Sequence, residues 1–155
     1  HVCTGDLLRE AVQKENALGA KVGTVMAAGA LVPDSIMIEV MRERLKEKDC
    51  AAGYLLDGFP RTHEQADALD KFLKEEGDEI DFVVSLKVSR EELIKRMGYR
   101  GRDDDKDEVI LRRLKIYEDQ TAMLVDYYRQ KGKLVEVEGL GSVEKITQRV
   151  LKGLS

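Results

Sequence analysis

The stretch GYLLDGFPRT, at residues 53–62, joins a short apolar run to an acid and then to a turn that contains glycine and proline. Such an apolar run is typical of a buried parallel strand. Gly58 allows a ligand to approach the backbone, and Pro60 restricts the turn, so Arg61 is expected to project from a rigid loop. Asp57 ends the apolar run, where an acid can hold the water shell of a magnesium ion. The alternative interpretation is a tight turn with a solvated acid.

Alternating helices and strands are predicted on both sides of this stretch. Strands separated by helices favour a single α/β domain, residues 1–155, built on a parallel sheet whose ligands bind at the carboxyl ends of the strands. Thr4 or Asp6 is placed to cap the first helix, and Ser89 and Glu92 are placed to form a capping box. The predicted helices cover residues 4–13, 19–28, 35–48, 62–76, 91–97, 104–131 and 143–151, and the predicted strands cover residues 53–57, 82–88 and 134–138.

Composition narrows the possible functions. Charged residues make up 36% and hydrophobic residues 43% of the 155 residues, which is the balance of an ordinary globular protein. The net charge of −4 argues against a general nucleic-acid-binding protein. Apolar runs are strand-sized, so no transmembrane helix is expected. Cys3 and Cys50 form no CxxC pair, which favours reduced thiols in the cytoplasm over a disulfide framework or a zinc site.

Three further polar segments are candidates for binding an anion. The predicted helix start at residues 4–9 offers free backbone N–H groups with Arg9 one turn further on, although a capped helix with a surface arginine has the same pattern. Residues 137–142 lead from a strand through two glycines to a helix, as an ordinary turn also does. Five arginines, interleaved with aspartates, either converge on phosphates or form a solvated helix face. They are Arg96, Arg100, Arg102, Arg112 and Arg113.

Together these segments resemble the adenylate kinase family of nucleoside monophosphate kinases. The family pattern TGD-x-LR stands at residues 4–9, LLDGFPRT followed by Gln-Ala stands at residues 55–66, and an R-x-DD pattern ending in RL is matched loosely at residues 102–114. The order and spacing are those of the family, and the resemblance covers essentially the whole chain. It implies a parallel sheet covered on both faces by helices, as in P-loop kinases, with residues 5–34 as a helical insertion that binds AMP.

The resemblance implies a role for each of these polar residues. Thr4 would contact the adenine of AMP, Gln65 would read the adenine edge, and Asp57 would position the water shell of Mg²⁺. A threonine before Gly5 favours AMP over UMP or CMP. The residues implied in AMP binding are Thr4, Arg9, Met26, Leu31, Val32, Gly58, Arg61, Gln65, Arg102 and Arg113. The residues implied in catalysis are Arg61, Arg96, Arg100, Arg102 and Arg113, and those implied in ATP binding are Arg96, Arg100 and Gly141.

Two departures from the family pattern stand out. The family begins with a strand and the loop G-x-x-G-x-G-K, whose backbone N–H groups hold phosphates, and no such motif occurs in the 155 residues. In the family that strand lies between the strands at residues 54–57 and 82–88, which without it would leave backbone groups unpaired at a cost of about 1–3 kcal/mol each. The family's mobile lid is reduced to one glycine within residues 98–102. We therefore expect these residues to be part of a longer natural chain.

The expected activity is reversible, Mg-dependent phosphoryl transfer from ATP to AMP, which yields two ADP by in-line transfer without a covalent intermediate. The alternatives are an AMP-binding remnant without catalysis and a UMP/CMP-type monophosphate kinase. The expected partners are the nucleotides AMP, ATP and ADP, with Mg²⁺ accompanying ATP. Binding to nucleic acid or to a membrane is not expected. We expect a cytoplasmic monomer.

A polypeptide of these 155 residues alone is expected to bind AMP weakly and to transfer phosphoryl groups at a negligible rate. It would lack the backbone cradle for the donor phosphates, the loop lysine and the central strand, so both positioning and charge stabilisation would be lost. The measurement is a coupled assay of ADP formation on protein of verified mass, with and without the missing segment added as a peptide. Robust turnover without that peptide would contradict the expectation.

Overall fold

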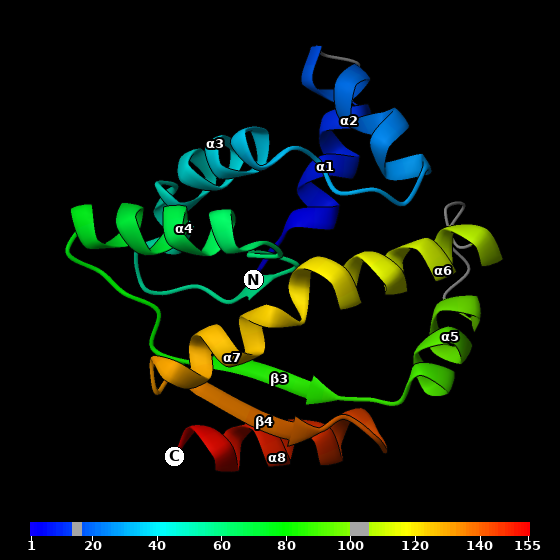
Figure 1. Cartoon of the computed structure of the whole chain (residues 1–155). Coiled ribbons are helices and arrows are strands. Elements are labelled where there is room, and N and C mark those ends of the chain that lie inside the picture. Colours follow the sequence, from blue (N-terminus) through cyan, green and yellow to red (C-terminus); the bar gives the residue numbers. More distant parts are fainter. Residues whose placement is uncertain (14–16, 100–105) are drawn as a thin grey trace.

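The computed structural model describes residues 1–13, 17–99 and 106–155 (Figure 1). The helices are α1 (Thr4–Gln13), α2 (Ala17–Ala27), α3 (Asp34–Leu45), α4 (His63–Glu75), α5 (Arg90–Tyr99), α6 (Asp107–Ile116), α7 (Met123–Gln130) and α8 (Val143–Leu154). The strands are β1 (Val2–Cys3), β2 (Leu56–Asp57), β3 (Val83–Lys87) and β4 (Leu134–Glu138). A 3₁₀ turn covers Lys48–Cys50, and a π-helical turn covers Tyr117–Thr121. Among the described residues, no helix is both long and apolar enough to cross a membrane.

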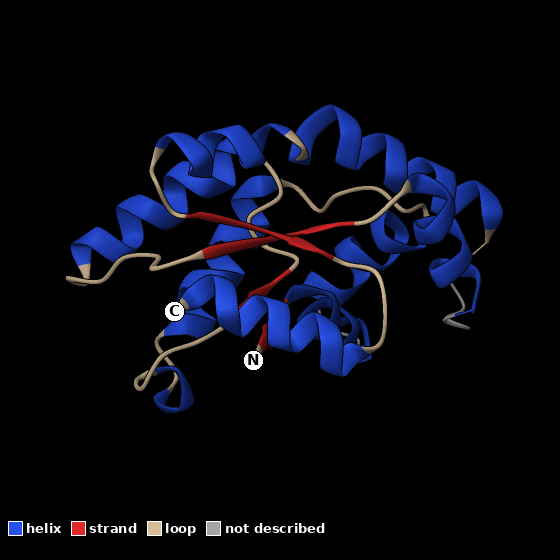
Figure 2. Cartoon of the chain, turned by 90° about the horizontal axis from the view of Figure 1, so that it is seen from below, coloured by secondary structure: helices blue, strands red, loops and turns tan. Residues whose placement is uncertain are grey.

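The strands form two separate parallel pairs in the described part of the chain. β1 pairs with β2, and β3 pairs with β4 along the full length of both strands. The predicted α/β class with parallel pairing is confirmed, but β2 and β3 are not hydrogen-bonded to each other. This division falls between the two strands where the family resemblance puts a central strand. Helices α7 and α8 lie on opposite sides of the β3–β4 pair, as Figures 1 and 2 show.

The prediction of a buried strand over residues 53–57 is wrong in length and in burial. Only Leu56 and Asp57 are in the ladder, and Leu55 is 63% exposed. Phe82 and Leu86, beside and within β3, are 53% and 50% exposed. Strands β2 and β3 each have a hydrogen-bonded neighbour along one edge only. The apolar run at residues 53–57 is typical of a strand inside a parallel sheet. Among the described residues, β2 has a paired strand on one edge only, so the apolar side chains beside it stay exposed.

The main core lies among α1, α2, α3, α4 and β1. Its most buried side chains include Val2, Val22, Met41 and Leu73, which are 1–2% exposed. The spacing of Ile36, Val40, Met41 and Leu45 predicts that they form one apolar face of α3, and this prediction is only partly correct. Met37 and Met41, four residues apart, are buried, whereas Ile36, Val40 and Leu45 are half-buried. A second cluster joins α4 to α7 through Ala66, Leu124 and Tyr128.

The long helix predicted over residues 104–131 is interrupted. α6 ends at Ile116, a π-helical turn follows, and α7 begins at Met123. Such turns widen a helix locally and redirect the side chains beside them. At the end of this turn the Thr121 hydroxyl donates a 2.8 Å hydrogen bond to the carbonyl of Arg61. The interruption therefore ties the helix to the turn after β2.

Side-chain caps begin α4, α5 and α8, where the Ser142 hydroxyl accepts from the backbone N–H of Lys145 at 3.5 Å. The Thr62 hydroxyl accepts from the backbone N–H of Gln65 at the start of α4, at 3.2 Å. The Ser89 hydroxyl accepts from the backbone N–H of Glu92 at 3.3 Å, as predicted. The Glu92 carboxylate pairs with Arg96 at 2.7 Å, so the reciprocal half of the predicted capping box is replaced by an ion pair.

Replacing Tyr128 with Phe is expected to stabilise the fold. Tyr128 is 2% exposed, and its hydroxyl has no hydrogen-bond partner among the described residues. Burial raises the pKa of this hydroxyl, and removing an unpaired buried hydroxyl relieves a cost of about 1–3 kcal/mol. The matched control is Tyr127→Phe, because the Tyr127 hydroxyl lies 2.9 Å from Asp67 and 2.8 Å from Asp70. Urea unfolding should give changes of opposite sign, and equal destabilisation by both variants would contradict the prediction.

Candidate functional site

A cavity of about 380 Å³ lies where α1, the loop after α2 and the turn after β2 meet. This volume falls within the range of small-molecule sites, about 300–1,000 Å³. Polar and apolar side chains from segments far apart in the sequence converge on it. The lining residues are Cys3, Thr4, Gly5, Leu8, Arg9, Met26, Gly29, Ala30, Leu31, Val32, Met37, Asp57, Gly58, Arg61, Gln65, Met97 and Arg113.

Pairing of β1 with β2 brings the two polar segments of this cavity together. Cys3 lies opposite Asp57 at the carboxyl ends of the two strands, so Thr4 and Gly58 are neighbours. The Thr4 hydroxyl lies 3.0 Å from the carbonyl oxygen of Gly58, to which it donates, and 3.3 Å from that of Asp57. Thr4 is the first residue of α1, and its hydroxyl donates across to the turn after β2, while the capping of this helix by Thr4 or Asp6 stays a prediction.

Gly58 is required by the geometry of this turn. Its φ of +78° is in the left-handed region, and a Cβ built there would lie 2.7 Å from the Thr4 hydroxyl oxygen and 2.9 Å from Nη2 of Arg61. The next peptide bond, Phe59–Pro60, is cis. Two side chains of the protein itself therefore occupy the space that a methyl group would take, and the approach of a ligand to Gly58 stays a prediction.

Arg61 is held by its surroundings at three points. Its Nε donates to the Gly58 carbonyl at 2.9 Å, its backbone N–H donates to Oε1 of Gln65 at 2.7 Å, and its carbonyl accepts from Thr121. Burial and the nearby positive charge of Arg113 lower the pKa of the Arg61 guanidinium. Two like charges that face one cavity repel each other, and an anion bound between them would relieve that repulsion.

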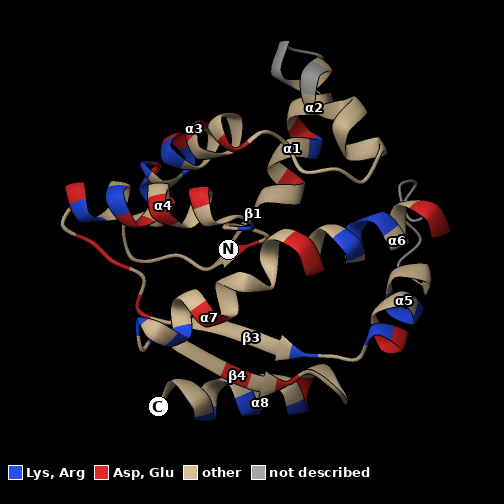
Figure 3. Ribbon diagram, in the orientation of Figure 1, with Lys and Arg blue, Asp and Glu red and all other residues tan. Residues whose placement is uncertain are grey.

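Arg9 lies on the same cavity from the opposite side. Its guanidinium rests against Gly5 and forms an ion pair with Asp6 on the exposed surface of α1. Exposed pairs of this kind contribute about 0–1 kcal/mol, so a phosphate can compete for the guanidinium. Figure 3 shows basic residues on α1, α5 and α6, the helices that border the cavity. The charge distribution therefore suits an anionic ligand.

Gln65 supplies a buried amide to the cavity. Its side chain is in the first turn of α4, and the residue is 2% exposed. Its Oε1 accepts from the Arg61 backbone, and its Nε2 donates to Oδ1 of Asp34 at 2.7 Å. The second oxygen of Asp34 accepts from the Thr62 hydroxyl at 3.0 Å. A buried amide with both polar atoms paired is held in one orientation.

Asp57 is the carboxylate at the wall of the cavity. It is exposed, ends β2, and lies 3.5 Å from Nε2 of His1. In the described ranges, no group of three or more His, Cys, Asp or Glu residues could hold a metal ion by themselves. Magnesium in nucleotide enzymes is commonly held by one or two carboxylates together with substrate phosphates. A lone exposed carboxylate beside an anion-binding cavity fits such a shared site.

The structure brings most of the predicted site residues together. Arg96 is not among the lining residues and pairs with Glu92, and Gly141 is in the loop between β4 and α8 with a φ of +115°. Arg100 and Arg102 lie outside the described residues. The residues that join the cavity are Thr4, Arg9, Met26, Leu31, Val32, Asp57, Gly58, Arg61, Gln65 and Arg113.

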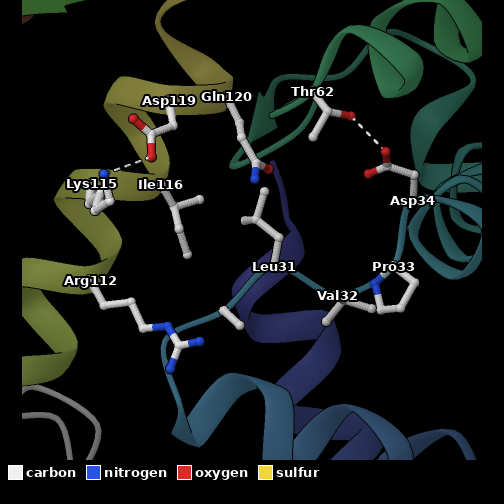
Figure 4. Close-up of a pocket in the computed structure, with 11 residues that line it drawn as sticks. Leu31, Val32, Pro33, Asp34, Thr62, Arg112, Lys115, Ile116, Asp119 and Gln120 are labelled. Atoms are coloured by element: carbon white, nitrogen blue, oxygen red, sulfur yellow. Dashed lines mark hydrogen bonds and ion pairs between the residues drawn. The ribbon is translucent and has the colours of Figure 1, made fainter.

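Sequence reasoning missed several residues of the cavity wall. Cys3 follows from its position before Thr4, once β1 is recognised as a strand. Met37 and Met97 line the cavity from α3 and α5, and no local motif marks either of them. A neighbouring cavity of about 510 Å³ shares residues 30–32 with the first and extends toward α6, as Figure 4 shows. Asp34 and Thr62 line this second cavity.

Comparison with known proteins gives consistent matches. A family model described as adenylate kinase matches residues 1–133. The adenylate kinase of Leptospira biflexa is 48% identical over 99% of this chain and 84% of its own length. The adenylate kinase of Parasynechococcus marenigrum is 48% identical over 100% of this chain and 84% of its own length. That of Caldicellulosiruptor bescii is 40% identical over 99% of this chain and 86% of its own length.

Replacing Gly58 with Ala is expected to destabilise the fold and to distort the cavity. The matched control is Gly77→Ala, because Gly77 has a similar φ of +76° but no atom within 4 Å of an added Cβ. Both variants should lose about 1–2 kcal/mol through the left-handed backbone, and Gly58→Ala should lose about 1–3 kcal/mol more through the clash with Thr4 and Arg61. Urea unfolding measures the difference. Equal losses would show that the space at Gly58 is not needed.

Proposed function

The chain belongs to the adenylate kinase family, and we propose that the 380 Å³ cavity is its AMP site. The family reaction transfers a phosphoryl group from ATP to AMP and yields two ADP. Convergence of three arginines on one cavity that also holds a buried amide is the observation that carries the proposal. Arg9, Arg61 and Arg113 come from α1, the β2–α4 turn and α6, and together they suit a phosphate. The cavity otherwise has the apolar walls that a purine base requires.

The base of AMP is proposed to lie against the loop after α2. Met26, Leu31 and Val32 supply apolar surface there, and Val32 is 4% exposed. Gln65 offers an amide for the adenine edge, and Thr4 lies at the cavity wall beside Gly58. A small residue such as alanine at position 4 could not donate to the Gly58 carbonyl. The preference for AMP over UMP or CMP is proposed on the family pattern, which has threonine at this position.

Catalysis in this proposal consists of positioning and charge stabilisation. Guanidinium groups from separate elements hold the phosphates in line and balance the negative charge of the transition state, so no side chain needs to act as acid or base. Arg61 and Arg113 are proposed to perform this role from the described part of the chain. The predicted roles on the side of the phosphoryl donor, ATP, stay predictions for Arg96, Arg100, Arg102 and Gly141. Arg96 can contribute because its exposed pair with Glu92 is weak enough for a phosphate to displace.

Mg²⁺ is proposed to accompany ATP, with Asp57 holding its water shell. The ion would neutralise the developing charge on the phosphates. Asp57 faces the cavity beside Arg61, and Asp57 raises the pKa of Arg61, against the lowering effect of burial and of Arg113. The carboxylate and the guanidinium therefore lie close enough to act on the same phosphates. A cytoplasmic monomer is proposed on family membership alone.

Replacing Arg61 with Ala is expected to weaken AMP binding about ten- to a hundredfold, because a charge-assisted bond to phosphate contributes about 1.5–3 kcal/mol. The fold should persist, since the side chain is exposed. The matched control is Arg129→Ala, which removes the same charge from α7, where Arg129 pairs with Asp126 and Glu136. Calorimetric titration of AMP measures both variants. An unchanged dissociation constant in Arg61→Ala would remove Arg61 from the site.

A further inference from the structure

We propose that Asp34 is a positioning residue that fixes the orientation of the Gln65 amide and thereby makes the site select a 6-aminopurine over a 6-oxopurine. The inference rests on the proposed function, in which Gln65 reads the edge of the base. It concerns a carboxylate that lies outside the AMP cavity. Asp34 begins α3 and lines the neighbouring 510 Å³ cavity, where Figure 4 shows its hydrogen bond with Thr62.

The two atoms of the Gln65 amide have partners of opposite kind. The backbone N–H of Arg61 can only donate, so the atom that it meets at 2.7 Å must be the amide oxygen. The Asp34 carboxylate can only accept when ionised, so the atom that it meets at 2.7 Å must be the amide nitrogen. Rotating the amide by half a turn would put donor against donor and acceptor against acceptor. The orientation is therefore determined by chemistry at both ends.

Asp34 is itself held in place by its second oxygen. That oxygen accepts from the Thr62 hydroxyl at 3.0 Å, and the same hydroxyl accepts from the backbone N–H of Gln65 at 3.2 Å. Thr62 is 8% exposed, so this network is largely shielded from water. Asp34 is also in the first turn of α3, where a negative charge is favoured by the helix dipole. The carboxylate is thus held in place by contacts from α3 and from the start of α4.

An amide in one orientation distinguishes the two classes of purine. Adenine presents a donor at N6 and an acceptor at N1, which match the amide oxygen and an amide N–H. Hypoxanthine presents an acceptor at O6 and a donor at N1, which match the same amide only after it has turned over. The second hydrogen of the amide nitrogen and the second lone pair of its oxygen stay available for the base. With Asp34 ionised, turning over loses two hydrogen bonds, one of them to a charged group.

The substitution Asp34→Asn tests this role without a change of shape. An asparagine amide can accept from the Gln65 nitrogen or, when rotated, donate to the Gln65 oxygen, so it removes the constraint at Asp34 and leaves only the Arg61 N–H to oppose the turned-over amide. We expect the ratio of AMP affinity to IMP affinity to fall by about tenfold, chiefly because IMP binds better. Loss of a negative charge near the site changes the affinities of both nucleotides alike and cancels in the ratio. A merely structural role for Asp34 would likewise leave the ratio unchanged.

The matched control is Asp119→Asn. Asp119 lines the same 510 Å³ cavity and pairs with Lys115 at 3.2 Å, so its replacement removes an equal charge from the same place. No described contact joins Asp119 to Gln65, and the control should keep the AMP to IMP ratio of the unaltered chain. Calorimetric titration with each nucleotide gives the ratio, and urea unfolding shows whether each variant is folded.

The outcomes separate this inference from the proposed function. A lower ratio in Asp34→Asn, together with an unchanged ratio in Asp119→Asn, supports the inference. If Gln65→Ala lowers the ratio but Asp34→Asn does not, Gln65 reads the base and the role of Asp34 is overturned. If Gln65→Ala leaves the ratio unchanged, the proposed reading of the base by Gln65 fails, and the inference fails with it. Failure of the unaltered chain to bind AMP would contradict the proposed site itself.

Discussion

The hydrogen bond from Thr4 to the Gly58 carbonyl joins the carboxyl ends of two parallel strands, and the shape of the cavity depends on it. Strand β1 leads into Thr4 at the start of α1, whereas β2 leads into the turn that carries Arg61. The Gly58 carbonyl also accepts from Arg61, so one backbone oxygen fixes both segments. Because parallel strands end at the same edge of a sheet, polar residues that follow them become neighbours. A two-residue ladder is enough to create this site.

The charges around the cavity are arranged for a ligand rather than for the protein. Arg61 is solvent-accessible, but partial desolvation at the cavity wall and the positive charge of Arg113 lower the pKa of its guanidinium. Arg9 is balanced by an exposed carboxylate on its own helix, which is a weak pair. A phosphate would satisfy all three guanidinium groups at once. In the proposed function AMP carries this phosphate, and these three arginines are the groups proposed to hold it.

A layer of neutral and acidic groups lies behind these arginines and determines their setting. The Gln65 amide oxygen accepts a hydrogen bond from the Arg61 backbone N–H, and the Asp34 carboxylate accepts one from the Gln65 amide nitrogen. Asp34 also accepts one from the Thr62 hydroxyl at the start of α4. Thr121 reaches the same turn from the π-helical interruption between α6 and α7. Three elements, α3, α4 and the π-helical turn, thus hold one loop. Such a network of paired, shielded groups keeps the side chains that face the ligand in a single arrangement.

Apart from β1, the sequence by itself determined the order of helices and strands, because periodicity, caps and turn residues act over a few neighbouring positions. It also predicted most of the candidate site, since DGFPRT and TGD-x-LR each contain their own turn chemistry. Only the tertiary structure decided the burial of residues 53–57, the interruption near Tyr117, the division into two strand pairs and the partner of the Thr4 hydroxyl. Each of these depends on which distant segment lies alongside, and neither propensity nor spacing along the chain specifies that contact.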